Sequence, residues 1–169
     1  MTESFDWAVA LLRLVAGGVI LAHGVKHARG RVKTANWFGS IGFRQPELQW
    51  FASTATEIGV GVLLIVGLGS SLAAAGLIAV MVVAFWTVHR SVGFWVTARP
   101  DEGWEYVLVL GTVGAAIAIG GPGEFSMDAV LGIEDLLSGW VAAVLVAGGI
   151  VAAALQIVTF FRPNEAAGT

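Results

Sequence analysis

Residues 50–89 read WFASTATEIGVGVLLIVGLGSSLAAAGLIAVMVVAFWTVH, two apolar runs joined at a glycine- and serine-rich turn. Each run approaches the roughly 20 residues that a helix needs to cross a bilayer. Neither alternates polar and apolar residues, as a membrane barrel strand would. The stretch therefore predicts two transmembrane helices, at residues 50–69 and 72–89, and Glu57 is the only Asp, Glu, Lys or Arg in it.

Three further segments have the same character, at residues 7–25, 104–121 and 139–161. The chain is 57% hydrophobic and 12% charged, about half the charged share of a soluble domain. It has no cysteine, which excludes disulfides, thiolate metal sites and iron–sulfur clusters. It also lacks the strong positive charge of a nucleic-acid-binding domain. We predict an all-α polytopic membrane helix bundle with five spans.

The basic residues outside these spans predict the orientation. They fall in the connections 1–2 and 3–4 and in the C-terminal tail, whereas acidic residues collect at the other ends. Because cytoplasmic connections are enriched in Lys and Arg, we expect the N-terminus outside and the C-terminus in the cytoplasm of a cell-membrane protein. Glu3 and Asp6 precede the first span where a signal peptide has basic residues, so we expect that span to be retained.

Two ionisable residues lie deep within the predicted spans, Arg13 in the first and Glu57 in the second. A charge in hydrocarbon is costly and usually has a partner or a function. Their estimated depths overlap, so we predict a buried pair between them. Ser53 and Thr56 share the face of Glu57 by helical spacing, which favours a polar cavity. The alternative is a pair that only fixes the helix register.

A second group, His23, His89 and Glu105, lies towards the inner ends of three spans and is able to converge there. These are proton-exchanging side chains, although helix ends also tolerate polar residues without a function. Lys26 and His27 are expected to contact lipid headgroups. No Glu-x-x-His or His-x-x-x-His pattern falls within the predicted spans, so we expect no metal and no bis-histidine haem.

Several motifs in fixed order resemble the DoxX family of small integral membrane proteins over roughly residues 8–132. The matching pieces are Leu12-Arg13-Leu14, His23-Gly24, and residues 36–42, 57–64, 84–89, 105–106 and 121–128. The resemblance implies a four-helix membrane unit tied to redox systems. It singles out Arg13, His23, Glu57, His89, Glu105 and Asp128, of which we expect Asp128 to be a helix or turn cap.

The fifth span lies beyond that four-helix unit. We therefore divide the chain into a DoxX-like domain, residues 1–135, and a fifth transmembrane helix with a short cytoplasmic tail, residues 136–169. The fifth span carries no ionisable residue, so it is expected to pack within the bundle or to dock a partner.

Three functions are compatible with these features. The first is a membrane subunit of a quinone-linked oxidoreductase system, with a pocket for a lipophilic quinone-like ligand lined by Phe85, Trp86 and Tyr106. The chain has no redox cofactor signature of its own, so electrons would come from partner subunits. The second is a non-catalytic assembly or anchor subunit. The third is a small proton, ion or lipid carrier, which the absence of inverted repeats disfavours.

Overall fold

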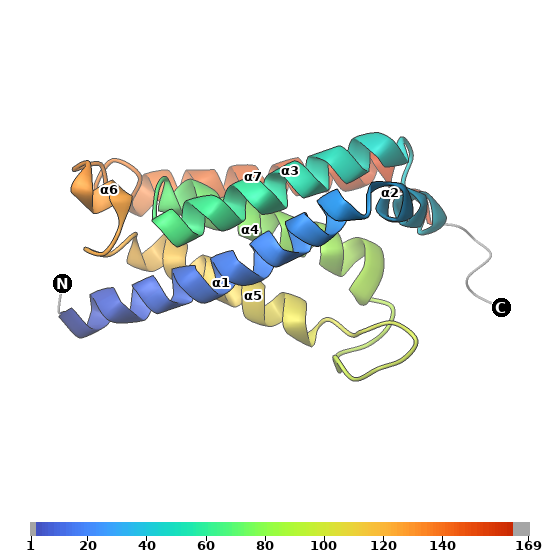
Figure 1. Cartoon of the computed structure of the whole chain (residues 1–169), viewed down its shortest axis with the longest axis horizontal. Coiled ribbons are helices and arrows are strands. Elements are labelled where there is room, and N and C mark those ends of the chain that lie inside the picture. The colour runs from blue at the N-terminus through green and yellow to red at the C-terminus, as the bar shows by residue number, and fades with distance from the viewer. Residues whose placement is uncertain (1–2, 164–169) are drawn as a thin grey trace.

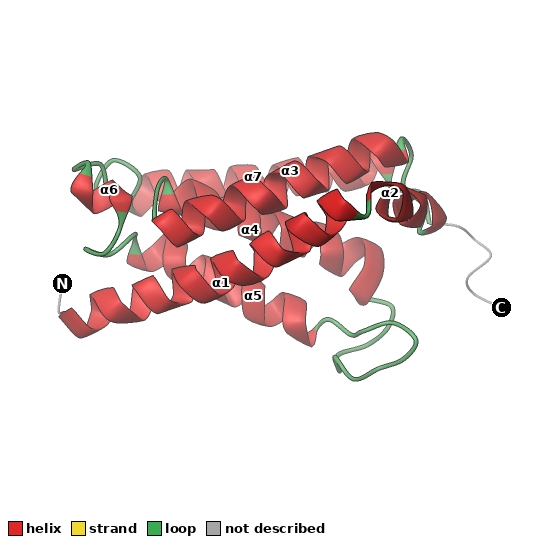
Figure 2. Ribbon diagram, viewed as in Figure 1, coloured by secondary structure: helices red, strands yellow, loops and turns green. Residues whose placement is uncertain are grey.

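A computed structural model describes residues 3–163, and its helices follow the apolar segments of the sequence. In chain order the elements are α1 (Glu3–Arg29), α2 (Arg31–Ser40), α3 (Pro46–Val66), α4 (Ser70–Ala84), the π-helical segment η1 (Phe85–His89), α5 (Glu105–Gly120), α6 (Met127–Val130) and α7 (Gly139–Phe160). Within the described residues every regular element is helical (Figure 2). The all-α prediction is confirmed.

The long helices lie side by side in one bundle, and the short elements lie at its two ends (Figure 1). One end carries α2, the loop between η1 and α5, and the C-terminal end of α7. The opposite end carries the N-terminus of α1 and α6. The first of these ends is the one where the sequence places its basic residues.

Four of the helical segments in the described part of the chain are long and apolar enough to cross a membrane: Glu3–Arg29, Pro46–Val66, Ser70–His89 and Gly139–Phe160. The predicted span at residues 104–121 is helix α5, which is equally apolar in character but has only 16 residues. Helix length and composition therefore support four of the five predicted spans directly.

Glycines bring α1 and α3 into close contact. A Cβ atom on Gly61 would lie 2.6 Å from Cβ of Leu21 and 2.9 Å from the carbonyl oxygen of Gly17. A Cβ atom on Gly24 would lie 2.9 Å from the amide nitrogen of Ile58. Only glycine allows backbones to approach this closely, and small residues are the usual means of helix association in lipid.

Helix α4 lies at the centre of the bundle and packs against α3, α5 and α7. Its buried residues Ala73, Ala74 and Leu77 belong to a cluster that also takes side chains from α1, α3 and α5. The N-terminal half of α4 is rich in alanine, which lets its neighbours come close on several sides.

Helix α7 packs on α4, in agreement with one of the two roles expected for it. A Cβ atom on Gly149 would lie 2.7 Å from the carbonyl oxygen of Ala75. Nε2 of Gln156 donates to Oε1 of Gln49 in α3 at 2.7 Å. At the end of α7, Phe161 packs with Phe38 and Phe43. The fifth long helix is thus part of the same bundle as the preceding ones.

We predict that the α1–α3 contact is a main source of stability. Gly61→Ala should lower the free energy of unfolding by about 2 kcal/mol, because its Cβ meets backbone atoms that cannot move independently. Gly59→Ala, on the same helix with open space around the new Cβ, should leave stability unchanged or raise it by up to about 1 kcal/mol. Unfolding of the purified protein in detergent would measure both, and equal effects would contradict the prediction.

Candidate functional site

A large cavity lies between the helices, towards the end of the bundle that carries α2. Its volume is 1520 Å³, larger than the 300–1,000 Å³ of most ligand pockets. Its walls come from α1, α2, α3, α4, η1, α5 and α7. Most of the lining side chains are apolar or small, and the charged ones besides Glu57 are Lys26, Arg29 and Lys33 at the end that carries α2.

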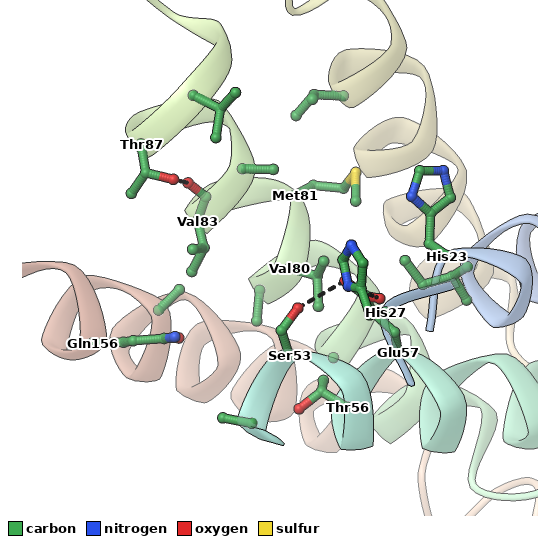
Figure 3. A pocket seen from close by; sticks show the side chains of 18 of the residues that line it. His23, His27, Ser53, Thr56, Glu57, Val80, Met81, Val83, Thr87 and Gln156 are labelled. Carbon is green, nitrogen blue, oxygen red and sulfur yellow. Dashed lines mark hydrogen bonds and ion pairs between the residues drawn. The ribbon is translucent and has the colours of Figure 1, made fainter. Parts of the chain in front are cut away.

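The polar part centres on Glu57, whose side chain is buried (Figure 3). Oγ of Ser53 donates to Oε1 of Glu57 at 2.9 Å. Nδ1 of His27 lies 3.0 Å from Oε2 of the same carboxylate. Glu57 therefore has one partner from its own helix and one from α1, and all three residues line the cavity.

Two more of the predicted residues approach this cluster from the side of α1 and α5. The imidazole of His23 stacks on the phenol ring of Tyr106, with ring centroids 6.1 Å apart. The Tyr106 hydroxyl lies 3.5 Å from Nε2 of His23. Both residues line the cavity. A planar ligand beside them would meet two rings and two groups able to exchange protons.

His89 reaches the cavity from η1. Its Nδ1 lies 2.6 Å from the backbone carbonyl oxygen of Glu102. Because a carbonyl oxygen only accepts, Nδ1 carries a hydrogen, and Nε2 is an acceptor whenever the ring is neutral. Segments of π-helix are rare and are frequent at functional sites. This one carries both Thr87 and His89 to the cavity wall.

Local sequence explains why these side chains meet. Ser53 and Glu57 are four residues apart on α3, and His23 and His27 are four residues apart on α1, so each pair shares one helix face. The close approach at Gly24 then brings that face of α1 against α3, since a Cβ atom there would lie 3.0 Å from Cβ of Glu57.

The predicted pair between Arg13 and Glu57 is wrong. Helices α1 and α3 run in opposite directions, so Arg13 lies at the level of Gly67, against which its guanidinium packs. Gly67 is ten residues from Glu57, about 15 Å along a helix. The depth estimate failed because hydropathy does not give the register of α1 on α3, in which Gly17 faces Gly61 and Gly24 faces Ile58.

Arg13 belongs instead to a buried polar cluster at the opposite end of the bundle. It donates a hydrogen bond to the carbonyl oxygen of Phe125. Nearby, the carboxylate of Asp128 accepts hydrogen bonds from the backbone amides of Gly69 at 2.7 Å and Ser70 at 2.9 Å. Asp128 thus caps the start of α4, which confirms its expected role as a cap.

Three other candidates from the sequence do not line the cavity. Oε2 of Glu105 accepts a hydrogen bond from the amide of Val96 at 3.1 Å, which ties the loop after η1 to α5. Phe85 packs edge-to-face on Trp104. Trp86 points outward, with the guanidinium of Arg90 4.2 Å from its ring centroid. Of the three predicted aromatic residues, Tyr106 alone is among the cavity residues.

His27 is the cavity residue that the sequence interpretation missed. It was expected to contact headgroups because the predicted first span ended at residue 25, whereas α1 continues to Arg29. With the longer helix, His23 and His27 form a His-x-x-x-His pair, with ring centroids 6.4 Å apart. The four-residue spacing of His23 and His27 was the signal in the sequence that could have placed both side chains on one helix face. Within residues 3–163, no three His, Asp or Glu side chains are grouped so that they could hold a metal ion.

Comparisons with known proteins agree with the resemblance found in the sequence. Residues 8–90 match the model of the DoxX family. The chain is 29% identical over 117 residues to a protein of Bacillus subtilis (strain 168) named "Putative oxidoreductase CatD", a match that covers 69% of this chain and 83% of that protein. No solved structure matched the chain. The matched family region contains His23, His27, Ser53, Glu57 and His89.

We predict that Asp128 stabilises the fold. Asp128→Ala removes two hydrogen bonds from a carboxylate to the first amides of α4. Because such charge-assisted caps are strong, the free energy of unfolding should fall by about 2 kcal/mol. Asp101→Ala, in an exposed loop, should leave it unchanged. Thermal unfolding in detergent would compare the two variants, and similar melting temperatures would show that the cap contributes little.

Proposed function

Because this chain belongs to the DoxX family through residues 8–90, we propose that it is a membrane subunit of a redox system whose cavity binds a lipophilic quinone-like molecule. The observation that carries the proposal is the position of Glu57. Its carboxylate is buried, held by Ser53 and His27, and turned into a cavity with mostly apolar walls.

A quinone ring needs an apolar slot and a few groups that hydrogen bond to its two carbonyl oxygens or exchange protons with them. In our proposal the imidazole of His23 donates to a carbonyl oxygen, and His27 and His89 donate through Nε2 when the ring is protonated on both nitrogens. Glu57 accepts or returns the proton, and the ring of Tyr106 stacks on the quinone. This assignment extends the predicted site by His27 and leaves Arg13 and Glu105 to structural roles.

Electrons would reach the quinone from a partner protein. The sequence contains no pattern typical of a flavin, nicotinamide, haem or iron–sulfur site, and the relative in Bacillus subtilis carries the name of an oxidoreductase. We therefore propose that the chain works with other protein subunits in the membrane, and that its own contribution is to bind and position the quinone.

We propose five spans, with the N-terminus outside and the C-terminus in the cytoplasm of a cell-membrane protein. The basic residues of α2 and of the connections lie at the bundle end that would face the cytoplasm. Helix α5 packs beside α4 within the bundle. At 16 residues it is about 24 Å long, short of a hydrocarbon core of about 30 Å. Local thinning of the bilayer or the flanking loops would make up the difference.

The quinone site predicts that Glu57 controls affinity. Binding of a tailed benzoquinone to the reconstituted full-length protein should weaken about tenfold in Glu57→Gln, which corresponds to roughly 1.4 kcal/mol. That loss is the size expected when a hydrogen bond to a charged group is removed. His89→Ala should also weaken binding. Isothermal titration or quenching of intrinsic fluorescence would measure the dissociation constants.

Glu47→Gln is the matched control for Glu57→Gln. Glu47 lies on the same helix but outside the cavity, where its carboxylate pairs with Arg31 at an exposed position. Its substitution should leave quinone affinity unchanged. If wild-type affinity also survives in Glu57→Gln and His89→Ala, the pocket is not the quinone site, and a role in assembly replaces it.

The proposed topology makes a separate prediction about α5. The chain has no cysteine, so single cysteines report sidedness without background. Ser91→Cys and Glu124→Cys are both exposed positions, one on each side of α5 in the sequence. In intact cells a membrane-impermeant maleimide should label Glu124→Cys and not Ser91→Cys. Labelling of both would show that α5 does not cross the membrane.

A further inference from the structure

Beyond the polar cluster, the cavity continues as an apolar groove along α4 and α7. The lining residues here carry no charge, and most are small: Leu72, Ala75, Gly76 and Ala79 from α4, and Val144, Leu145, Gly148, Gly149, Ala152 and Ala153 from α7. From Val144 to Gln156 the groove follows thirteen residues of α7, a rise of about 18 Å. That is more than half of a hydrocarbon core about 30 Å thick.

The groove is open on the outside of the bundle. Val144, Gly148 and Ala152 line the cavity and are also exposed, and so is Thr56 on α3. A Cβ atom built on Gly148 would have no atom within 4 Å. The three α7 residues are four apart, so they form one stripe on the helix. Because these positions lie within apolar helices, the medium that they face is lipid.

Between α3 and α7 the groove is closed towards the end of the bundle that carries α2, although Lys26, Arg29 and Lys33 also line the cavity at that end. There the hydrogen bond between Gln49 and Gln156 joins α3 to α7. Next to it, Phe161 packs with Phe38 and Phe43. A ligand that reaches the groove between α3 and α7 therefore passes from the lipid, along the middle of the helices.

We propose that the apolar groove along α4 and α7 holds a long alkyl or isoprenoid tail of the ligand, which enters from the lipid through the opening between α3 and α7. The inference rests on the proposed function for the head of the ligand. It adds a class of ligand, one with a long apolar tail, and a direction of entry.

Physical chemistry favours this route. A tail that passed through water would expose its whole apolar surface, which is unfavourable in proportion to its area. A tail that moves from lipid into the groove avoids that step. Lipid chains are as apolar as the groove itself, so selectivity for the tail depends on packing. Small residues provide the space for that packing, and a larger side chain in the stripe should remove it.

The experiment compares two probes that share one head. One is a benzoquinone with a decyl tail, and the other is the same benzoquinone with a methyl group in place of the tail. Binding is measured with the full-length protein in lipid nanodiscs. In Gly148→Leu the affinity for the decyl probe should fall about tenfold, whereas the affinity for the methyl probe should change less than about twofold.

Two control comparisons separate filling of the groove from general damage. Gly18→Leu introduces the same side chain at another exposed helical glycine with open space around it, outside the cavity. Ala152→Leu blocks the groove one turn from Gly148, and Ala154→Leu is its exposed control on the same helix. Both groove variants should lose affinity for the decyl probe, and both controls should keep it.

The outcomes distinguish this inference from the proposed function. If Glu57→Gln weakens both probes but Gly148→Leu and Ala152→Leu weaken neither, the head site stands and the tail site is overturned. If the groove variants weaken both probes equally, the groove does not recognise the tail, and the inference is again overturned. If neither probe binds the wild-type protein, the proposed function fails and the tail site fails with it.

Discussion

The close approach of α1 and α3 determines the arrangement of the polar groups at both ends of the bundle. Gly17, Gly24 and Gly61 fix how far apart the two helices lie and how they align along their length. Because the helices are antiparallel, one alignment places Arg13 near Gly67 and, four turns further along α1, His27 beside Glu57. A shift of one helical turn would separate His27 from Glu57. The proposal that the cavity is a ligand site therefore depends on close contacts made at glycines, which have no side chain to bind a ligand.

Hydropathy was sufficient to locate the long helices of the bundle. The predicted span at residues 104–121 corresponds to Glu105–Gly120, and the one at 139–161 corresponds to Gly139–Phe160. Agreement is this good because the bilayer sets both the length and the composition of a spanning helix. The largest error in the predicted helix bounds is at the C-terminal end of the first span. The first span was taken to end where basic residues begin, but Lys and Arg in the last turn stabilise a helix C-terminus, and α1 continues to Arg29.

The candidate site was only partly predictable, because it depends on how the helices align. Glu57, His23 and His89 were identified from the cost of ionisable groups in apolar segments, and Tyr106 was named as an aromatic that would stack on the ligand; all four line the cavity. Their partners on facing helices were not identified, although Ser53 was placed on the face of Glu57 to which it donates a hydrogen bond. Which residue of α1 faces Glu57 depends on where two backbones touch, and hydropathy carries no information about that contact. Trp86 illustrates the same difficulty in η1, because the π-helical turn that follows Ala84 changes the direction in which each later side chain points.

The pair formed by Glu57 and His27 has two explanations, and the packing of α1 on α3 helps to choose between them. One explanation is that the pair fixes the register of the two helices. That register is already fixed by three positions at which a Cβ atom would meet the facing helix within 3.0 Å, so a polar pair adds little to it. Buried ion pairs also contribute little to stability on balance.

The other explanation is that the pair serves the cavity. It lies at the wall of a space large enough for a ligand, where a carboxylate in apolar surroundings is costly unless something polar binds to it. The packing of α1 on α3 therefore favours the proposal that the pair serves the cavity.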